Sequence, residues 1–286
     1  MFYKSTSHGL FATVALVGTV TMGAGIMGAG ASAATLEITV TNTSGIGGFA
    51  ITPLLAVFHD GSYDAFNVGD AASPGLESLA ETGNPSGLPA EIAAADPSAA
   101  SVVIAAPDSG PPTIDPGETT SAMITLDETS NRYLSFLAML VPSNDTFLGN
   151  DDATAYEIFD AMGDFVGDFS IEVSGLFLYD AGTEVNDPTD GAAFVAGVDA
   201  TLGTDEGGTV HAATSLAAFA GVATPLGTLD GSLIDFTTTP SRFSLATISI
   251  SAVPPAPVPL PASALLLIGS IGLLGGVSRR KRRLAG

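Results

Sequence analysis

The chain contains no cysteine and no tryptophan, and residues 34–257 contain no lysine. Without cysteine there is no disulfide bond and no thiolate-ligated metal, and the redox compartment cannot be read from the sequence. The motifs GxSxG, HExxH and the P-loop are also absent. These absences remove the catalytic signatures that a sequence most readily reveals.

Basic residues are almost confined to the two ends of the chain. Residues 34–257 hold all thirty acidic residues but only Arg132 and Arg242 as strong bases, which gives a net charge of −28 (2 − 30). Nucleic-acid binding requires a basic surface that neutralises phosphates, so this balance excludes it. Direct attraction to an anionic membrane is excluded as well, except through a bridging cation. An acidic surface instead suits solubility, a salty medium or the binding of divalent metal ions.

The N-terminus has the parts of a secretory signal peptide. Lys4 supplies a positive charge, and residues 10–27 form an apolar stretch rich in Gly and Ala. Residues 31–33, Ala-Ser-Ala, match the A-x-A pattern of a cleavage site. We therefore predict a signal peptide over residues 1–33 and an exported mature chain that begins at Ala34.

The C-terminus combines a short apolar segment with a basic cluster. Residues 262–277 are small or apolar and precede the Arg- and Lys-rich residues 279–283. This segment is shorter than the roughly 20 residues that span a bilayer, and the basic cluster favours the cytoplasmic side. Val-Pro-Leu-Pro-Ala (258–262), an apolar helix over 262–277 and a basic tail together resemble the VPLPA type of PEP-CTERM sorting signal of Gram-negative bacteria. The resemblance implies transient inner-membrane anchoring and processing of residues 258–286 by an exosortase-type enzyme. A plain tail anchor is the alternative.

Period-2 alternation dominates the central region and predicts β-strands. Apolar and polar residues alternate over 36–41, 169–174 and 246–251, as in strands with one solvated face. Residues 133–141 are almost uniformly apolar, which predicts a strand buried on both faces of a sandwich. We predict an all-β fold over residues 34–252, followed by a Pro-rich linker at 253–257.

One or two short helices interrupt the strands. Ser73 can cap the first helix, Pro74 suits its first position and Gly83 can end it. Residues 93–116 are rich in Ala, Ser, Asp and Pro. This composition predicts a long surface loop.

The mature region offers only His59 and His211 as imidazole bases. A Ser–His–Asp triad is assembled in space and stays open, but His59 stands beside turn residues, and we interpret it as structural. Paired carboxylates of a polysaccharide hydrolase also stay open in so acidic a chain. The lack of tryptophan argues mildly against a sugar-stacking site.

Two acidic loops carry the clearest chemical signal. Asp145 follows the strand expected at 133–141, whereas Asp180 and Glu184 follow an apolar run at 176–179. If both strands end at the same end of the sandwich, these three carboxylates converge. Calcium takes six to eight such oxygen ligands. On spacing alone, simple solvation of these acids is the alternative interpretation.

Three segments together resemble the bacterial form of the spondin N-terminal domain: HDGSYDAFNVGDAASPGLESLAETG (59–83), PSNDTFLGND (142–151) and YDAGTEVND (179–187). Animal members carry PSPDWFVG and DAGTD at the corresponding places of the last two. The resemblance implies an antiparallel, C2-like β-sandwich with calcium at one loop end, held by Asp145, Asp180 and Glu184. Glu184 replaces an aspartate and Thr146 replaces a tryptophan of the animal motifs, and the framework cysteines of animal members are missing.

These features predict an exported, calcium-binding, non-enzymatic protein of a Gram-negative envelope. It would act in adhesion or in an extracellular matrix, with an extracellular polysaccharide or a surface protein as its partner. A carboxylate-based polysaccharide hydrolase and a purely structural acidic surface protein are the alternatives.

Overall fold

A computed structural model of the chain describes residues 33–106 and 112–254, in which two antiparallel β-sheets share one core. The first sheet has the order β5-β1-β13-β8, and the second has β10-β9-β7-β6-β3-β4 with β2 paired to β6. The strands of the first sheet are β1 (Ala33–Asn42), β5 (Thr119–Asp127), β8 (Phe169–Ser174) and β13 (Ser244–Ala252). Those of the second are β2 (Ala50–Ile51), β3 (Leu54–His59), β4 (Ala100–Ile104), β6 (Tyr133–Val141), β7 (Thr146–Gly149), β9 (Leu178–Asp180) and β10 (His211–Ala212). A separate hairpin joins β11 (Ala223–Thr224) to β12 (Gly227–Thr228).

The alternating segments of the sequence form strands of the first sheet, as predicted. Leu36, Ile38 and Val40 of β1 are fully buried in the core. The intervening side chains carry hydroxyls that pair across strands, for example Thr41 Oγ1 with Thr119 Oγ1 at 2.9 Å. The antiparallel sandwich with one solvated face is therefore confirmed.

Strand β6 is buried on both faces, which also confirms the prediction. Phe136 and Leu140 belong to the core between the sheets. Leu137 packs on the opposite side, in a cluster with residues of the helices. Met139 and Val141 belong to a third, smaller apolar cluster on that same outer side. The strand can be apolar throughout because protein covers both faces.

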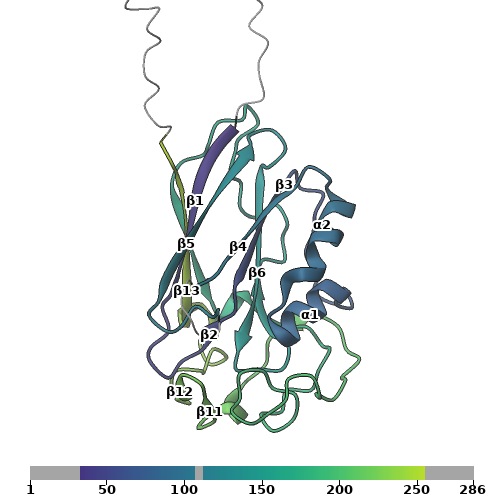
Figure 1. Cartoon of the computed structure of the whole chain (residues 1–286), viewed down its shortest axis with the longest axis vertical. Helices are drawn as coiled ribbons and strands as arrows, with labels where there is room; N and C mark the ends of the chain where they lie inside the picture. Colours follow the sequence, from purple (N-terminus) through teal and green to yellow (C-terminus); the bar gives the residue numbers. More distant parts are fainter. Residues whose placement is uncertain (1–32, 107–111, 255–286) are drawn as a thin grey trace, which may run out of the picture. The chain divides into compact units, whose positions relative to one another are not determined.

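Two short helices, α1 (Pro74–Thr82) and α2 (Leu88–Ala95), cover the outer face of the second sheet (Figure 1). The predicted signals start and end α1: the Ser73 hydroxyl accepts a hydrogen bond from the Leu76 N–H at 3.2 Å, and Gly83 takes the left-handed conformation with φ 69°. Glu91 of α2 adds a contact, because its carboxylate accepts from the Ser73 hydroxyl at 2.6 Å.

The expectation of a long loop over residues 93–116 is wrong in its first half. Helix α2 extends to Ala95, and β4 pairs with β3 from Phe58 opposite Ala100 to Leu54 opposite Ile104. The short apolar run of β4 gains its structure from an edge position beside β3. Such tertiary pairing overrides a composition that is typical of loops.

The segments predicted as signal peptide and as C-terminal sorting signal lie outside the described residues, except for Ala33, which starts β1. Within residues 33–106 and 112–254, no helix has the length and hydropathy needed to cross a membrane. Both sheets, the helices and the core that they share lie between residues 33 and 254. The hydrophobic core of the described residues therefore lies within the range 34–257.

Candidate metal centre

Two of the expected ligands meet where β7 and β9 lie side by side. Asp145 immediately precedes β7, and Asp180 is the last residue of β9. The antiparallel register places Thr146 opposite Asp180, which in turn lies opposite His211 of β10. The structure thus brings Asp145 and Asp180 to the same end of the second sheet.

The Asp145 carboxylate is fully buried, and only one of its oxygens is paired. Its Oδ2 accepts hydrogen bonds from the backbone N–H groups of Thr183 and Glu184, at 2.8 and 3.1 Å, and from the Thr183 hydroxyl at 3.3 Å. Its Oδ1 is buried without a hydrogen-bond partner among the described residues. An unsatisfied buried acceptor costs about 1–3 kcal/mol, and more when it is charged. The fold therefore keeps an unpaired carboxylate oxygen at a stability cost.

Asp180 is also buried and lies beside this charge. Its Oδ1 accepts from the Gly182 N–H at 2.9 Å, and its Oδ2 accepts from the Asn186 amide at 2.8 Å. Burial, reinforced by the Asp145 charge, raises the pKa of Asp180 to about 6. His211 Nδ1 lies 3.9 Å from Asp180 Oδ1 but only 2.9 Å from the Thr209 carbonyl oxygen, so it bonds to the carbonyl.

Glu206 provides a third carboxylate that the sequence interpretation missed. One oxygen each of Asp145, Asp180 and Glu206 lies within 4.8 Å of the others; we call this set the three-carboxylate cluster. The Glu206 N–H donates to the Thr183 carbonyl oxygen at 2.8 Å, and the Gly208 N–H donates to that of Gly182 at 2.7 Å. Glu206 is exposed, so it borders the cluster on the solvent side.

Glu184 contributes its backbone to this site, while its carboxylate lies outside the three-carboxylate cluster. Its Oε2 lies 3.4 Å from the Asn144 amide nitrogen, and a Cβ on Gly203 would overlap its carboxylate. Burial, followed by the charge of Glu81, raises the pKa of Glu184 to about 7. The structure therefore does not join Glu184 to Asp145 and Asp180 as a third carboxylate.

Comparison with known protein families gives one match. The model of the spondin N-terminal domain (Spondin_N) matches residues 49–212, which is more than half of the chain. The chain belongs to the spondin N-terminal family. No curated protein matches the sequence. Family membership suggests an extracellular or adhesion-type protein. The matched range contains the whole three-carboxylate cluster.

The donor set in this spondin-type domain suits a hard divalent cation. Carboxylate oxygens are the ligands that Ca²⁺ prefers. A cation could pair with the unpaired Oδ1 of Asp145 and offset the repulsion among three close negative charges. An arginine could offset the same charge, but Arg132, one of two arginines in the described residues, is already bonded to Glu157 at 2.7 Å. The residues present therefore fit Ca²⁺, with Asp145, Asp180 and Glu206 as its protein carboxylates.

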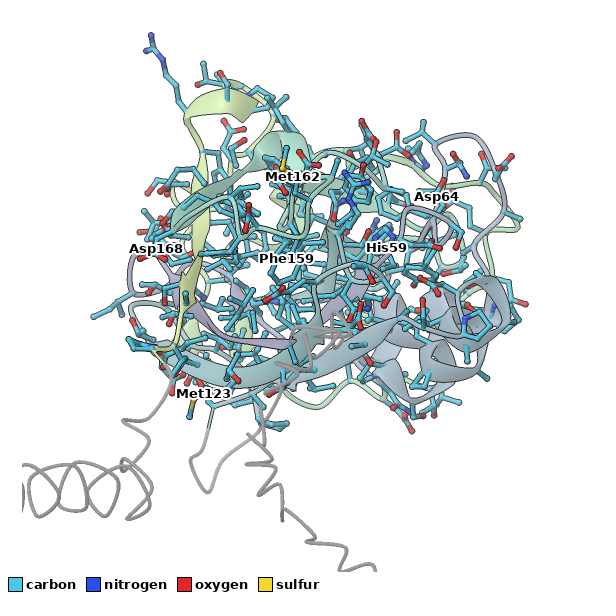
Figure 2. The ribbon with its side chains drawn as sticks, turned by 90° about the horizontal axis from the view of Figure 1, so that it is seen from above. His59, Asp64, Met123, Phe159, Met162 and Asp168 are labelled. Carbon is cyan, nitrogen blue, oxygen red and sulfur yellow. The ribbon has the colours of Figure 1, made fainter. Side chains whose placement is uncertain are left out.

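His59 is held in a structural role. Its ring is fully buried, and Figure 2 shows it among the side chains inside the domain. Its Nδ1 accepts from the Gly61 N–H at 3.1 Å, so the ring proton is on Nε2, which donates to the Ser135 hydroxyl at 3.1 Å. A triad needs the reverse arrangement, with Nε2 free to accept the serine proton. Burial also lowers the pKa of His59, which keeps the ring neutral.

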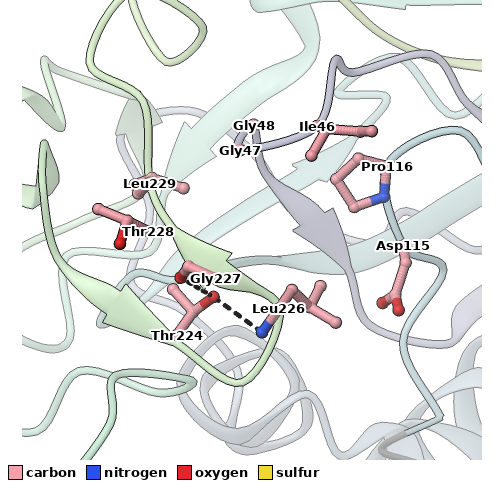
Figure 3. Close-up of a pocket in the computed structure, with 10 residues that line it drawn as sticks. All are labelled: Ile46, Gly47, Gly48, Asp115, Pro116, Thr224, Leu226, Gly227, Thr228 and Leu229. Atoms are coloured by element: carbon pink, nitrogen blue, oxygen red, sulfur yellow. Dashed lines mark hydrogen bonds between the residues drawn. The ribbon is translucent and has the colours of Figure 1, made fainter.

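A surface hollow of about 180 Å³ lies between the Gly47–Gly48 turn and the β11–β12 hairpin (Figure 3). Among the described residues that line it, Asp115 is the one carboxylate, and its Oδ1 accepts from the Thr113 hydroxyl at 2.8 Å. The described lining thus offers one carboxylate, whereas acid–base hydrolysis of a glycoside uses two.

Proposed function

We propose that this spondin-type domain binds Ca²⁺ through the three-carboxylate cluster. The observation that supports the proposal is the buried Asp145 carboxylate, which has an unpaired oxygen and forms one cluster with Asp180 and Glu206. When bound, the ion would supply the positive charge that these carboxylates lack. It would thereby connect the segment before β7, the end of β9 and the segment around Glu206.

We further propose that the protein is exported through residues 1–33 and acts in adhesion or in an extracellular matrix, without turnover. The burial of Asp145 and Asp180 supports a binding role, because a hydrolase must expose its carboxylates to the substrate. The expected partner is an extracellular polysaccharide or a surface protein. Residues 258–286 would anchor the chain briefly in the inner membrane of a Gram-negative cell until an exosortase-type enzyme processes it.

Calcium titration of residues 34–257 by calorimetry tests the metal site, in about 0.15 M salt to screen diffuse binding to the acidic surface. We expect one saturable site. Glu206→Gln should weaken it at least tenfold, whereas Glu184→Gln, the matched change in the adjoining segment, should alter affinity less. Weak, unsaturable binding would reject the site, and a larger loss with Glu184→Gln would return Glu184 to the ligand set.

The sorting proposal has a separate test. Mass spectrometry of the protein isolated from the producing cells should find a C-terminus that lacks residues 279–283. An intact tail in the membrane fraction would instead support a plain tail anchor and reject processing.

A further inference from the structure

The outer face of the second sheet is only partly covered by the helices. Beside the C-terminal end of α1 it holds a cavity of about 500 Å³. Met139 and Val141 of β6, both buried, underlie this cavity, and Gly83, which ends α1, is among its lining residues. Phe194 and Val103, the latter from β4, contribute further apolar surface to the lining. We call this cavity the Met139 pocket. Its volume falls within the roughly 300–1,000 Å³ typical of small-molecule sites.

The lining contrasts with the rest of the domain in charge. None of the described residues that line the Met139 pocket is ionisable, although residues 34–257 carry a net charge of −28 (2 − 30). Pro53, Pro85 and Pro112 form parts of the wall, and their fixed φ angles make it rigid. Val103 is 45% exposed here. The acidic domain thus has an uncharged, largely apolar concave surface at this place.

Backbone strain supports a role for this pocket. Phe194 has φ 66°, and among the described residues it is the one non-glycine residue with a positive φ. This conformation costs about 1–3 kcal/mol in a residue with a bulky side chain. The neighbouring Ala193 is fixed by a hydrogen bond from its N–H to the Ser143 carbonyl oxygen at 2.9 Å. The strained residue is therefore one that lines the pocket.

We propose that the Met139 pocket binds a neutral small molecule that carries an aromatic ring. An anion would be repelled by the surrounding negative charge, and a cation would find no carboxylate in the lining to offset its desolvation. A flat ring can pack against the partly exposed side chains of Phe194 and Val103. The Thr52 hydroxyl, which accepts from the Met139 N–H at 2.9 Å, retains its own proton to donate to a polar group on the ring.

Binding of the neutral fluorescent probe N-phenyl-1-naphthylamine to residues 34–257 tests this proposal, with EDTA present so that the result is independent of calcium. We expect saturable binding with a stoichiometry of one. Val103→Asp should weaken it at least tenfold, because it places a charge at the exposed edge of the pocket. Met123→Asp is the matched control: Met123 is 65% exposed on β5 of the other sheet, and this change should leave affinity unaltered.

Phe194→Gly separates binding from folding. Glycine adopts a positive φ without strain, which offsets part of the packing lost when the Phe194 ring leaves the cluster of Met139 and Val141. The variant should therefore unfold cooperatively with a melting temperature near that of the wild type, while probe affinity falls at least tenfold. Unsaturable binding by the wild type, or unchanged affinity in both pocket variants, would overturn the proposal. Binding by residues 34–257 that disappears in the full chain would also overturn it, because the pocket would then belong to a terminal segment of the protein itself.

Discussion

The Asp145→Asn variant should be more stable than the wild type when calcium is absent and less stable than the wild type when calcium is present. The amide oxygen can take the place of Oδ2 and keep the hydrogen bonds from Thr183 and Glu184. The amide nitrogen then takes the place of Oδ1, which has no hydrogen-bond partner among the described residues. One change therefore removes a negative charge, removes an unpaired buried acceptor and deletes a proposed metal ligand.

The magnitude follows from the geometry. Two like charges within 4.8 Å repel by about 3 kcal/mol at an effective dielectric constant of 20. Exchanging charge-assisted for neutral hydrogen bonds at the remaining oxygen costs about 1–2 kcal/mol, since the charged form is roughly twice as strong. Without metal, Asp145→Asn should gain about 1–2 kcal/mol, which raises Tm by roughly 2–6 °C in a domain of this size. Calcium at 100 times Kd should add about 2.7 kcal/mol to the wild type alone and reverse the order.

Melting curves in EDTA and in calcium measure this reversal. Asp199→Asn is the matched control: the Asp199 Oδ1 accepts only from Thr201, in a turn that Asn forms equally well, and Asp199 is outside the cluster. It should shift neither curve by more than about 1 °C. If Asp145→Asn lowers Tm in EDTA and retains the full calcium effect, the carboxylate serves only to hold the loop, and the metal site is refuted.

Three further changes test other parts of the fold. Burial lowers the pKa of His59, so the unfolded chain takes up that proton at a higher pH than the folded chain. As pH falls below about 6.5, the free energy of unfolding should therefore decrease more for the wild type than for His59→Gln. Urea unfolding at pH 7 and pH 5 measures both decreases, and equal decreases would contradict this. Ser73→Ala should cost about 1 kcal/mol in the same urea assay, because it removes the α1 cap, and an unchanged midpoint would count against that role. Gly203→Ala should cost about 1–3 kcal/mol through its overlap with Glu184, and Glu184→Ala in the same chain should recover part of that loss.

The elements that could be predicted are those whose own residues show a hydrophobic pattern and mark where the element begins and ends. The alternation over 36–41 encodes one buried and one solvated face, and β1 has this pattern. The unbroken apolar run of 133–141 predicted β6, and Ser73 and Gly83 marked the ends of α1. In each case the prediction rests on the hydrophobic pattern or on the capping residues of that segment alone.

Strand β4 escaped prediction because its partner determines it. Only five residues long, Ala100–Ile104 is an edge strand that pairs on β3. Its flanks are rich in Ala, Pro and Asp, which is typical of loops. The hydrogen bonds that make it a strand come from residues more than forty positions earlier along the chain. The hydrophobic pattern of the segment itself does not indicate that it pairs with β3.

In the candidate metal site, too, some residues could be predicted from their own segment, whereas others depend on contacts with distant segments. Asp145 follows the predicted strand at 133–141 and Asp180 follows the predicted apolar run at 176–179, and their convergence follows from the antiparallel pairing of β7 with both β6 and β9. Glu206 reaches them from a segment with no strand pattern, held to the site by the backbone bonds of Glu206 and Gly208. Glu184 was expected as a ligand because it lies in the acidic loop after the apolar run at 176–179 and matches the last acid of the family's DAGTD motif. Its N–H points at Asp145 Oδ2, and its carboxylate lies against Gly203 instead. A position in an acidic motif can therefore serve the site through its backbone, and only the three-dimensional arrangement separates that role from direct coordination.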